Sequence, residues 1–125
     1  MNFKIDTKEK FTVITPETDC LDANIAGELW KTATMCLAEA PHNVIVNLRE
    51  VKKADNDAVN DITGLQQHFY ENGASFVICE VAKTLLPQFE SEDLRDVLNI
   101  TPTESEAWDI VQMDEIEREL MNGME

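Results

Sequence analysis

The chain has 125 residues and a composition that excludes several classes of function. Lys and Arg together number 10 against 25 Asp and Glu, so the formal net charge is -15. Nucleic-acid binding needs a basic stripe that contacts phosphates, and anionic membrane surfaces attract basic segments, so we expect neither partner. The length fits one domain, and 43% apolar with 28% charged residues is typical of a globular protein.

The chain shows no signal of export or membrane insertion. No stretch approaches the roughly 18 consecutive apolar residues of a membrane span. The first residues, Met1 to Asp6, alternate polar and apolar and have no signal-peptide core. We therefore expect a cytoplasmic protein.

Cysteine and histidine usage predicts neither a metal site nor a cofactor. The three cysteines, Cys20, Cys36 and Cys79, are odd in number and form no CxxC pair, which argues against a disulfide framework or a zinc site. We expect Cys36 and Cys79 to be buried structural residues. His42 and His68 have no local setting typical of a catalytic histidine, and we expect them at the surface or at its boundary with the core.

The first half of the chain predicts a hairpin followed by a helix. Two β-rich segments, 3–6 and 11–15, flank a polar, turn-sized stretch. Apolar residues then recur at helical spacing over about 22–40. Asp22 is a suitable N-cap for that helix, and Pro41 a stop.

The middle of the chain predicts two buried strands around a second helix. The run 44–46 is continuously apolar and β-branched, as in a strand covered on both faces. Apolar residues at helical spacing over 58–69 predict a helix capped by Asn56 or Asp57, and Gly73 suits its left-handed C-terminal cap. A second buried strand follows at 76–79.

The last third predicts a short helix, a strand and a long acidic helix. The helix covers about 83–90 and the strand 97–100. Thr103 to Glu106 forms a capping box. The long helix, about 104–122, carries apolar Ala107, Trp108, Val111, Ile116 and Leu120. The element order predicts a single α/β domain, with a mixed four- to five-stranded sheet, one antiparallel edge strand, and helices packed largely on one side.

Several short motifs together resemble the STAS domain, the module of anti-sigma factor antagonists that also forms the cytosolic tail of sulfate transporters. That family has a buried strand, then Asp-Ser-Ser/Thr-Gly at a helix start, then a Gly before the next strand. Here the strand ends at Asn47, the helix start reads Asp55-Asn56-Asp57-Ala58, and Gly73 precedes the next strand. Leu21-Asp22-Ala23 and the segment 102–107 also resemble family motifs. The resemblance implies one STAS-like domain over 1–125, with a core of about 3–112.

The resemblance implies a non-catalytic module that binds an anti-sigma factor, a kinase-like ATPase. In the family, the second Ser or Thr of the motif is phosphorylated by this partner. Asp57 stands at that position, so no hydroxyl is present and a fixed charge replaces the phosphate. The implied partner-binding residues are Lys53, Asp55, Asn56, Asp57, Ala58 and Asp61.

Other interpretations of the same residues stay open. Asp57 at a helix start also suits simple capping, Asp55 suits a structural role in the loop, and Thr63 is a remaining hydroxyl. The domain also suits a subunit of a larger assembly, such as a transporter ATPase complex. Asp55 and Asp57 loosely match the nucleophile and acid of magnesium-dependent phosphatases, although a lysine-rich stretch separates them from the strand.

Two further interpretations concern larger parts of the chain. Length, acidity and a mid-chain Asp suit a response-regulator receiver, but the acidic pair and the late lysine of that fold are missing. The segment 101–125 carries eight acidic residues and one basic residue, Arg118. Its acidic helix is either a solvated face or a docking surface for a basic partner.

Overall fold

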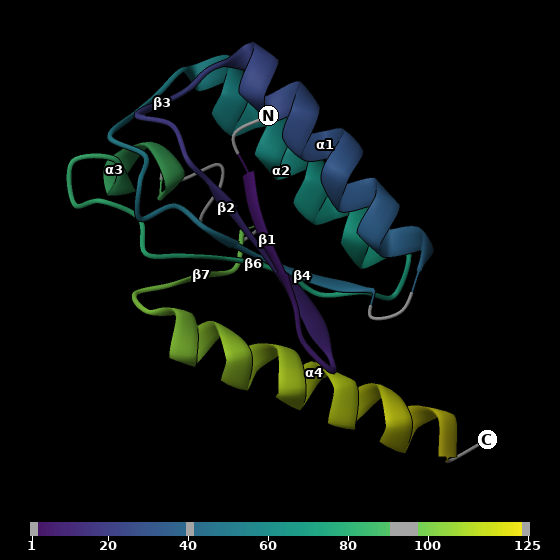
Figure 1. Ribbon diagram of the computed structural model, residues 1–125. Coiled ribbons are helices and arrows are strands. Elements are labelled where there is room, and N and C mark those ends of the chain that lie inside the picture. Colours follow the sequence, from purple (N-terminus) through teal and green to yellow (C-terminus); the bar gives the residue numbers. More distant parts are fainter. Residues whose placement is uncertain (1–2, 40–41, 91–97, 124–125) are drawn as a thin grey trace.

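The computed structural model describes residues 3–39, 42–90 and 98–123, which form a sheet with helices on both faces (Figure 1). The strands are β1 (Phe3–Thr7), β2 (Phe11–Pro16), β3 (Cys20–Leu21), β4 (Asn43–Asn47), β5 (Lys53–Ala54), β6 (Phe76–Cys79) and β7 (Ile100–Thr101). The helices are α1 (Ala23–Ala38), α2 (Asn56–Glu71), α3 (Leu86–Phe89) and α4 (Glu104–Gly123).

The main sheet has five strands in the order β1-β2-β4-β6-β7. β1 pairs antiparallel with β2, and every other neighbouring pair is parallel. The predicted α/β domain with a mixed sheet and one antiparallel edge strand is therefore confirmed. The short strands β3 and β5 form a separate parallel ladder that the sequence did not indicate.

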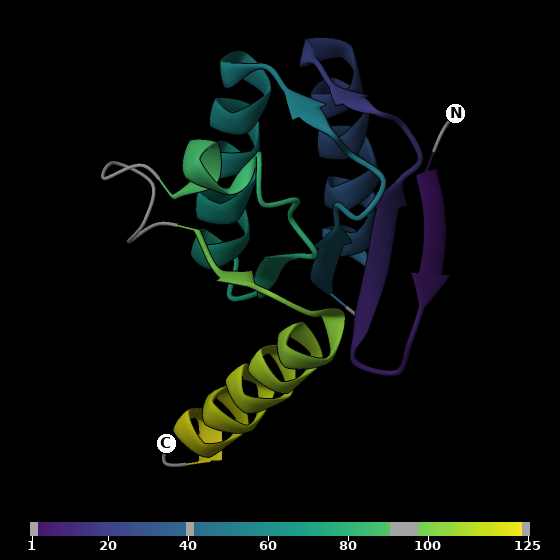
Figure 2. The same cartoon turned by 90° about the vertical axis from the view of Figure 1, so that its left-hand side faces the viewer.

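Two hydrophobic cores lie on opposite faces of the sheet, and β4 contributes to both. Val44 and Val46 pack in the larger core with α1, α2 and α3, whereas Ile45 packs in the smaller core under α4. Alternate side chains of a strand point to opposite faces, so one strand supplies both layers. Three helices thus cover one face, as predicted, and α4 covers the other (Figures 1 and 2).

Both ends of β4 hold α4 through buried asparagines. At one end, Asn47 Nδ2 donates to Glu104 Oε1 at 3.0 Å. At the other, Asn43 Nδ2 donates to Glu115 Oε1 at 2.8 Å. Each asparagine side chain is about 2% exposed, so water cannot substitute for these contacts. The two pairs fix the position of α4 along the sheet.

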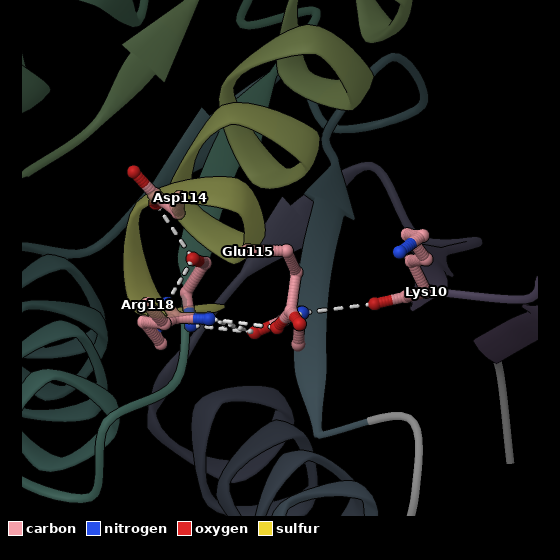
Figure 3. Close-up of polar contacts among 6 residues, drawn as sticks. Lys10, Asp114, Glu115 and Arg118 are labelled. Atoms are coloured by element: carbon pink, nitrogen blue, oxygen red, sulfur yellow. Dashed lines mark hydrogen bonds and ion pairs between the residues drawn. The ribbon is translucent and has the colours of Figure 1, made fainter. Parts of the chain in front are cut away.

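Asn43 is the centre of a polar cluster beneath α4, and Figure 3 labels Lys10, Asp114, Glu115 and Arg118 of this cluster. Its Nδ2 also donates to the Lys10 carbonyl at 2.9 Å, and its Oδ1 accepts from the Ser75 backbone N–H at 2.8 Å. Arg118 donates to Glu115 at 2.7 Å and to the Ser75 hydroxyl, which in turn donates to Asp114 at 2.6 Å. The cluster joins β2, β4 and the start of β6 to α4.

Two details of the structure differ from the sequence pattern, and a third prediction is not tested. The last strand, β7, begins three residues later and ends one residue later than the predicted 97–100, because Leu98 and Asn99 precede the pairing with β6. Ile116 and Leu120 share the helical spacing of the apolar residues of α4 but are 55% and 63% exposed, because they lie on the side of the helix that faces away from the sheet. Pro41 and Val97, part of the predicted helix stop and strand, lie outside the described residues.

Replacing Asn43 with Ala is expected to destabilise the whole domain. Buried donors and acceptors left without partners cost about 1–3 kcal/mol each, so we expect the free energy of unfolding to fall by about 2–4 kcal/mol. Urea unfolding measures the change. Asn60→Ala, at an exposed position of α2, is the matched control and should change stability by no more than about 0.5 kcal/mol. Equal effects of the two substitutions would contradict a role of Asn43 in holding the layers.

Candidate protein-binding surface

The start of α2 is reached by a tight turn beyond the carboxyl end of β4. Leu48 N–H donates to the Cys79 carbonyl at 3.0 Å, which extends the pairing with β6 by one residue. Val51 N–H then donates to the Leu48 carbonyl at 3.1 Å. The side chains of Leu48 and Val51 are buried, so the turn is anchored in the core although Arg49 and Glu50 are exposed.

The ladder of β3 and β5 fixes the rest of this connection. Lys52 and Lys53 donate their backbone N–H groups to the Asp19 carbonyl, at 2.7 and 3.0 Å. Asp55 N–H donates to the Leu21 carbonyl at 3.0 Å. Leu21-Asp22-Ala23 and the Asp55 loop, which are separate motifs in the sequence, therefore lie side by side, and the starts of α1 and α2 are neighbours.

Gln88, which belongs to α3, braces the loop from the other side. Its Nε2 donates to the Ala54 carbonyl at 2.8 Å and to Asn56 Oδ1 at 3.1 Å. These bonds occupy the last carbonyl of β5 and the first side chain of α2. Nothing in the sequence near Gln88 indicated this role, because the partners are more than 30 positions away.

The N-cap of α2 is Asp55, so the prediction of Asn56 or Asp57 at that position was wrong. Asp55 has an extended backbone, with φ -77° and ψ 147°, and its carbonyl accepts the first helical hydrogen bond from Val59 N–H at 3.1 Å. No side-chain capping bond from Asp55 to the described backbone is formed. Asp57 lies in the first turn, where its negative carboxylate interacts favourably with the positive end of the helix dipole. In contrast, Asp22 caps α1 as predicted, accepting from Ile25 N–H at 2.9 Å.

The structure exposes all but one of the predicted partner-binding residues. The exposed ones are Lys53, Asp55, Asn56, Asp57 and Asp61. Ala58 is fully buried against the core, so its inclusion among contact residues is corrected. The Thr63 hydroxyl is half-buried and donates to the Val59 carbonyl at 3.0 Å, within the helix. The loop and first turn of α2 thus form one exposed, mostly acidic surface, called here the α2 surface.

α2 is held in place along its length by α1. Trp30 Nε1 donates to the Asp61 carbonyl at 2.8 Å, and the Trp30 ring lies 5.6 Å from the half-buried His68 ring. A Cβ atom on Gly64 would come within 3.2 Å of the Trp30 ring, so the glycine allows this close approach of the two helices. The α2 surface is therefore presented on a fixed helix.

The described ranges contain no group of three or more His, Cys, Asp or Glu side chains placed to hold a metal ion. Asp55 and Asp57 are exposed on either side of Asn56 at a helix start, and β5 separates them from β4. Within the same ranges no helix is both long and apolar enough to cross a membrane.

Burial sets the chemistry of the cysteines. Cys79 is buried at the end of β6, and this burial, together with the carboxylates of Glu104 and Glu80, raises its pKa from 9.0 to about 12. Burial also raises the pKa of the Cys36 thiol, which is half-buried. Neither thiol has the depressed pKa of a nucleophile.

The structure is similar to solved domains of known families. A STAS domain protein from Planctomyces limnophilus superposes with a TM-score of 0.74 at 17% identity, covering 88% of this chain and 97% of that one. The anti-sigma factor antagonist SpoIIAA, solved unphosphorylated and phosphorylated, gives 0.69 at 20% identity for the unphosphorylated form, covering 88% and 96%. The murine anion transporter Slc26a9 gives 0.63 at 12% identity, covering 86% of this chain and 18% of that one.

These matches decide the fold. The chain has the STAS fold. No protein-family model and no curated protein matches the sequence itself. At these identities the likeness establishes architecture alone, so the partner and its regulation must be argued from this chain's own residues.

Replacing Gln88 with Ala is expected to loosen the α2 surface without unfolding the domain. Each hydrogen bond contributes about 1 kcal/mol, so local opening should become about fivefold more frequent or more. Hydrogen exchange of the Lys53 and Asp55 amides, read by NMR, measures the effect. Gln67→Ala, at an exposed position of α2, is the control. Unchanged exchange in the Gln88 variant would show that β3 alone holds the loop.

Cys79 is expected to resist a thiol reagent at about pH 8 while the domain is folded, because burial blocks access and keeps the thiol protonated. All three cysteines should react in urea, and a Cys79→Ala variant assigns the slow site. The free energy of unfolding should also fall above pH 9, because the unfolded thiol ionises near its ordinary pKa of 9.0 and the native one near 12. Rapid labelling of Cys79 in the native state would contradict its burial.

Proposed function

We propose that the chain is a non-catalytic protein-binding module that uses the α2 surface to dock an anti-sigma-type, histidine-kinase-like ATPase. The observation that carries the proposal is the exposed first turn of α2, held by β3, β5 and Gln88 on a STAS fold. A recognition surface fixed in this way loses little conformational entropy on binding. A structural neighbour, SpoIIAA, is an anti-sigma factor antagonist solved with and without phosphorylation.

The proposal assigns Asp57 to the position of the family phosphosite, as a permanent charge. A carboxylate carries one negative charge, whereas a phosphoserine carries about 1.5–2. Asp57 is exposed and forms part of no ion pair among the described residues, so its charge faces a docking partner. By the family's logic, such a chain resembles the phosphorylated form, which does not hold the kinase tightly.

A second candidate function is a subunit of a membrane transport assembly. It is favoured by the match to Slc26a9, in which the fold forms a part of a much longer anion transporter chain. The α2 surface serves this function equally well. The identity of the ATPase recovered from the native host separates the two functions: a histidine-kinase-like ATPase or a transporter ATPase.

The Asp57→Ser substitution is expected to strengthen binding to the cognate anti-sigma-type ATPase by about tenfold, because it removes the repulsive charge and restores a hydroxyl. Asp57→Lys should abolish binding for a steric reason, because its long side chain would fill the contact that the serine hydroxyl leaves open. The partner is first recovered with the wild-type chain, and the affinities are then measured by calorimetry without ATP. The dipole contribution of Asp57 is only about 0.3–1 kcal/mol, so both variants should fold.

The matched control is Glu9→Ser, which removes one carboxylate in the exposed turn between β1 and β2. It tests whether net charge, rather than the position of Asp57, sets the affinity. Equal binding of the wild type and Asp57→Ser would contradict the fixed-charge role. Equal binding of all variants, Asp57→Lys included, would move the docking surface away from the start of α2.

A further inference from the structure

The outer face of α4 carries an apolar stripe that no described residue covers. Met113, Ile116 and Leu120 recur at helical spacing, and each is more than half exposed. They point away from the sheet, since Ala107, Val111 and Arg118 occupy the inward side of the same helix. We call these three residues the α4 stripe.

The stripe is exposed because polar residues, not apolar ones, attach this half of α4. Asp114, Glu115 and Arg118 are turned inward and bind Ser75 and Asn43 (Figure 3). The apolar residues of this half therefore contribute nothing to the core. A solvent-facing apolar stripe on an attached helix has no role in the packing of the domain itself.

The apolar surface continues past the stripe. Met121 is 71% exposed and lines an open groove of about 680 Å³ between α4 and the end of α2. Tyr70 lines the same groove from α2 and is 76% exposed. Residues of two helices therefore offer apolar surface at this end of the molecule.

Carboxylates border the stripe. Glu106, Asp109, Glu117 and Glu119 are all exposed on α4. The only basic residue of α4, Arg118, is engaged with Glu115 and Ser75 on the inward side. A partner approaching the stripe therefore meets apolar side chains flanked by negative charge alone.

We propose that the α4 stripe docks a basic amphipathic helix of another protein. One apolar residue per turn forms a narrow seam that accepts the apolar face of a second helix, and Lys or Arg beside that face would pair with the flanking carboxylates. A second copy of this chain is disfavoured, because it would place carboxylates against carboxylates in a chain of net charge -15. The inference does not rest on the function proposed for the α2 surface, since α2 and α4 cover opposite faces of the sheet.

The test uses a fluorescent helical peptide of about 18 residues, roughly five turns, with leucines along one face and lysines elsewhere. Anisotropy is measured with the full chain at about 0.15 M salt. We expect the triple variant Met113→Gln, Ile116→Gln and Leu120→Gln to bind at least about tenfold more weakly than the wild type, since it loses apolar burial at unchanged net charge. Circular dichroism verifies that the variant is folded.

Two further variants separate the contributions. Ile5→Gln with Met35→Gln removes exposed apolar side chains elsewhere and should change binding less than about twofold. Asp109→Asn with Glu117→Gln and Glu119→Gln keeps the stripe and should weaken binding several-fold, with a smaller salt dependence. Equal binding by the wild type and the stripe variant would mean attraction by charge alone and would overturn the proposal. So would absence of binding, or a wild-type dimer in sedimentation that the stripe variant loses.

Discussion

The central strand β4 is apolar on both faces, so helices must pack against both. The asparagines at its two ends determine where α4 lies on the second face. Parallel neighbours use its backbone hydrogen bonds on both edges, and its apolar side chains divide between the two cores. Asn43 and Asn47 then stand buried at its two ends, and each needs a partner for its amide. Both find that partner on α4, in Glu115 and Glu104.

The geometry allows one straight helix to satisfy both asparagines. Four residues of strand span about 13 Å. The eleven residue-to-residue steps from Glu104 to Glu115 span about 16 Å of helix. A shift of α4 by one turn would remove the Glu104 acceptor of Asn47 Nδ2 and leave Asn43 Nδ2 with the Lys10 carbonyl alone, at about 1–3 kcal/mol for each lost partner. Part of the acidity of α4 is thus structural, while its outward carboxylates make no ion pair with the residues that the structure describes.

The periodic parts of the fold could be predicted from the sequence, and the long-range polar contacts could not. Strands such as β6 and the buried positions of α2 follow from local apolar spacing. β3 and β5 are two residues each, and their pairing joins positions more than 30 apart that carry no apolar alternation. The candidate site could be proposed from the sequence only because the segment 55–58 resembles a family motif. The support from Gln88 was beyond reach, because its contacts arise only when α3 folds beside α2.

A related limit applies to α4. Ala107 to Leu120 reads as one amphipathic helix, yet only its first half buries its apolar residues. The sequence carries a signal for this change, since Asp114, Glu115 and Arg118 interrupt the inward side. That signal can be interpreted only when the fold shows that Asn43 and Ser75 are the partners of these residues. The start of α4 is also held by a contact that local sequence does not indicate. Glu80 has a left-handed backbone, with φ 58°, and its carboxylate accepts a hydrogen bond from Glu104 N–H at 2.9 Å. This bond adds to the one that Thr103 of the predicted capping box accepts from Glu106 N–H.

The net charge of the chain affects the rate at which a partner approaches, whereas individual charges affect where the partner binds. A net charge of -15 attracts basic partners from a distance and speeds their encounter. At physiological salt, however, exposed charges act over only about 8 Å, so a single carboxylate on α2 affects only the contacts around it. The docking role proposed for Asp57 therefore depends on its position on α2, although it is one of 25 acidic residues. For the same reason, the carboxylates along α4 act only on what lies against α4, on the opposite face of the sheet from α2, so the two proposed docking surfaces are independent of each other.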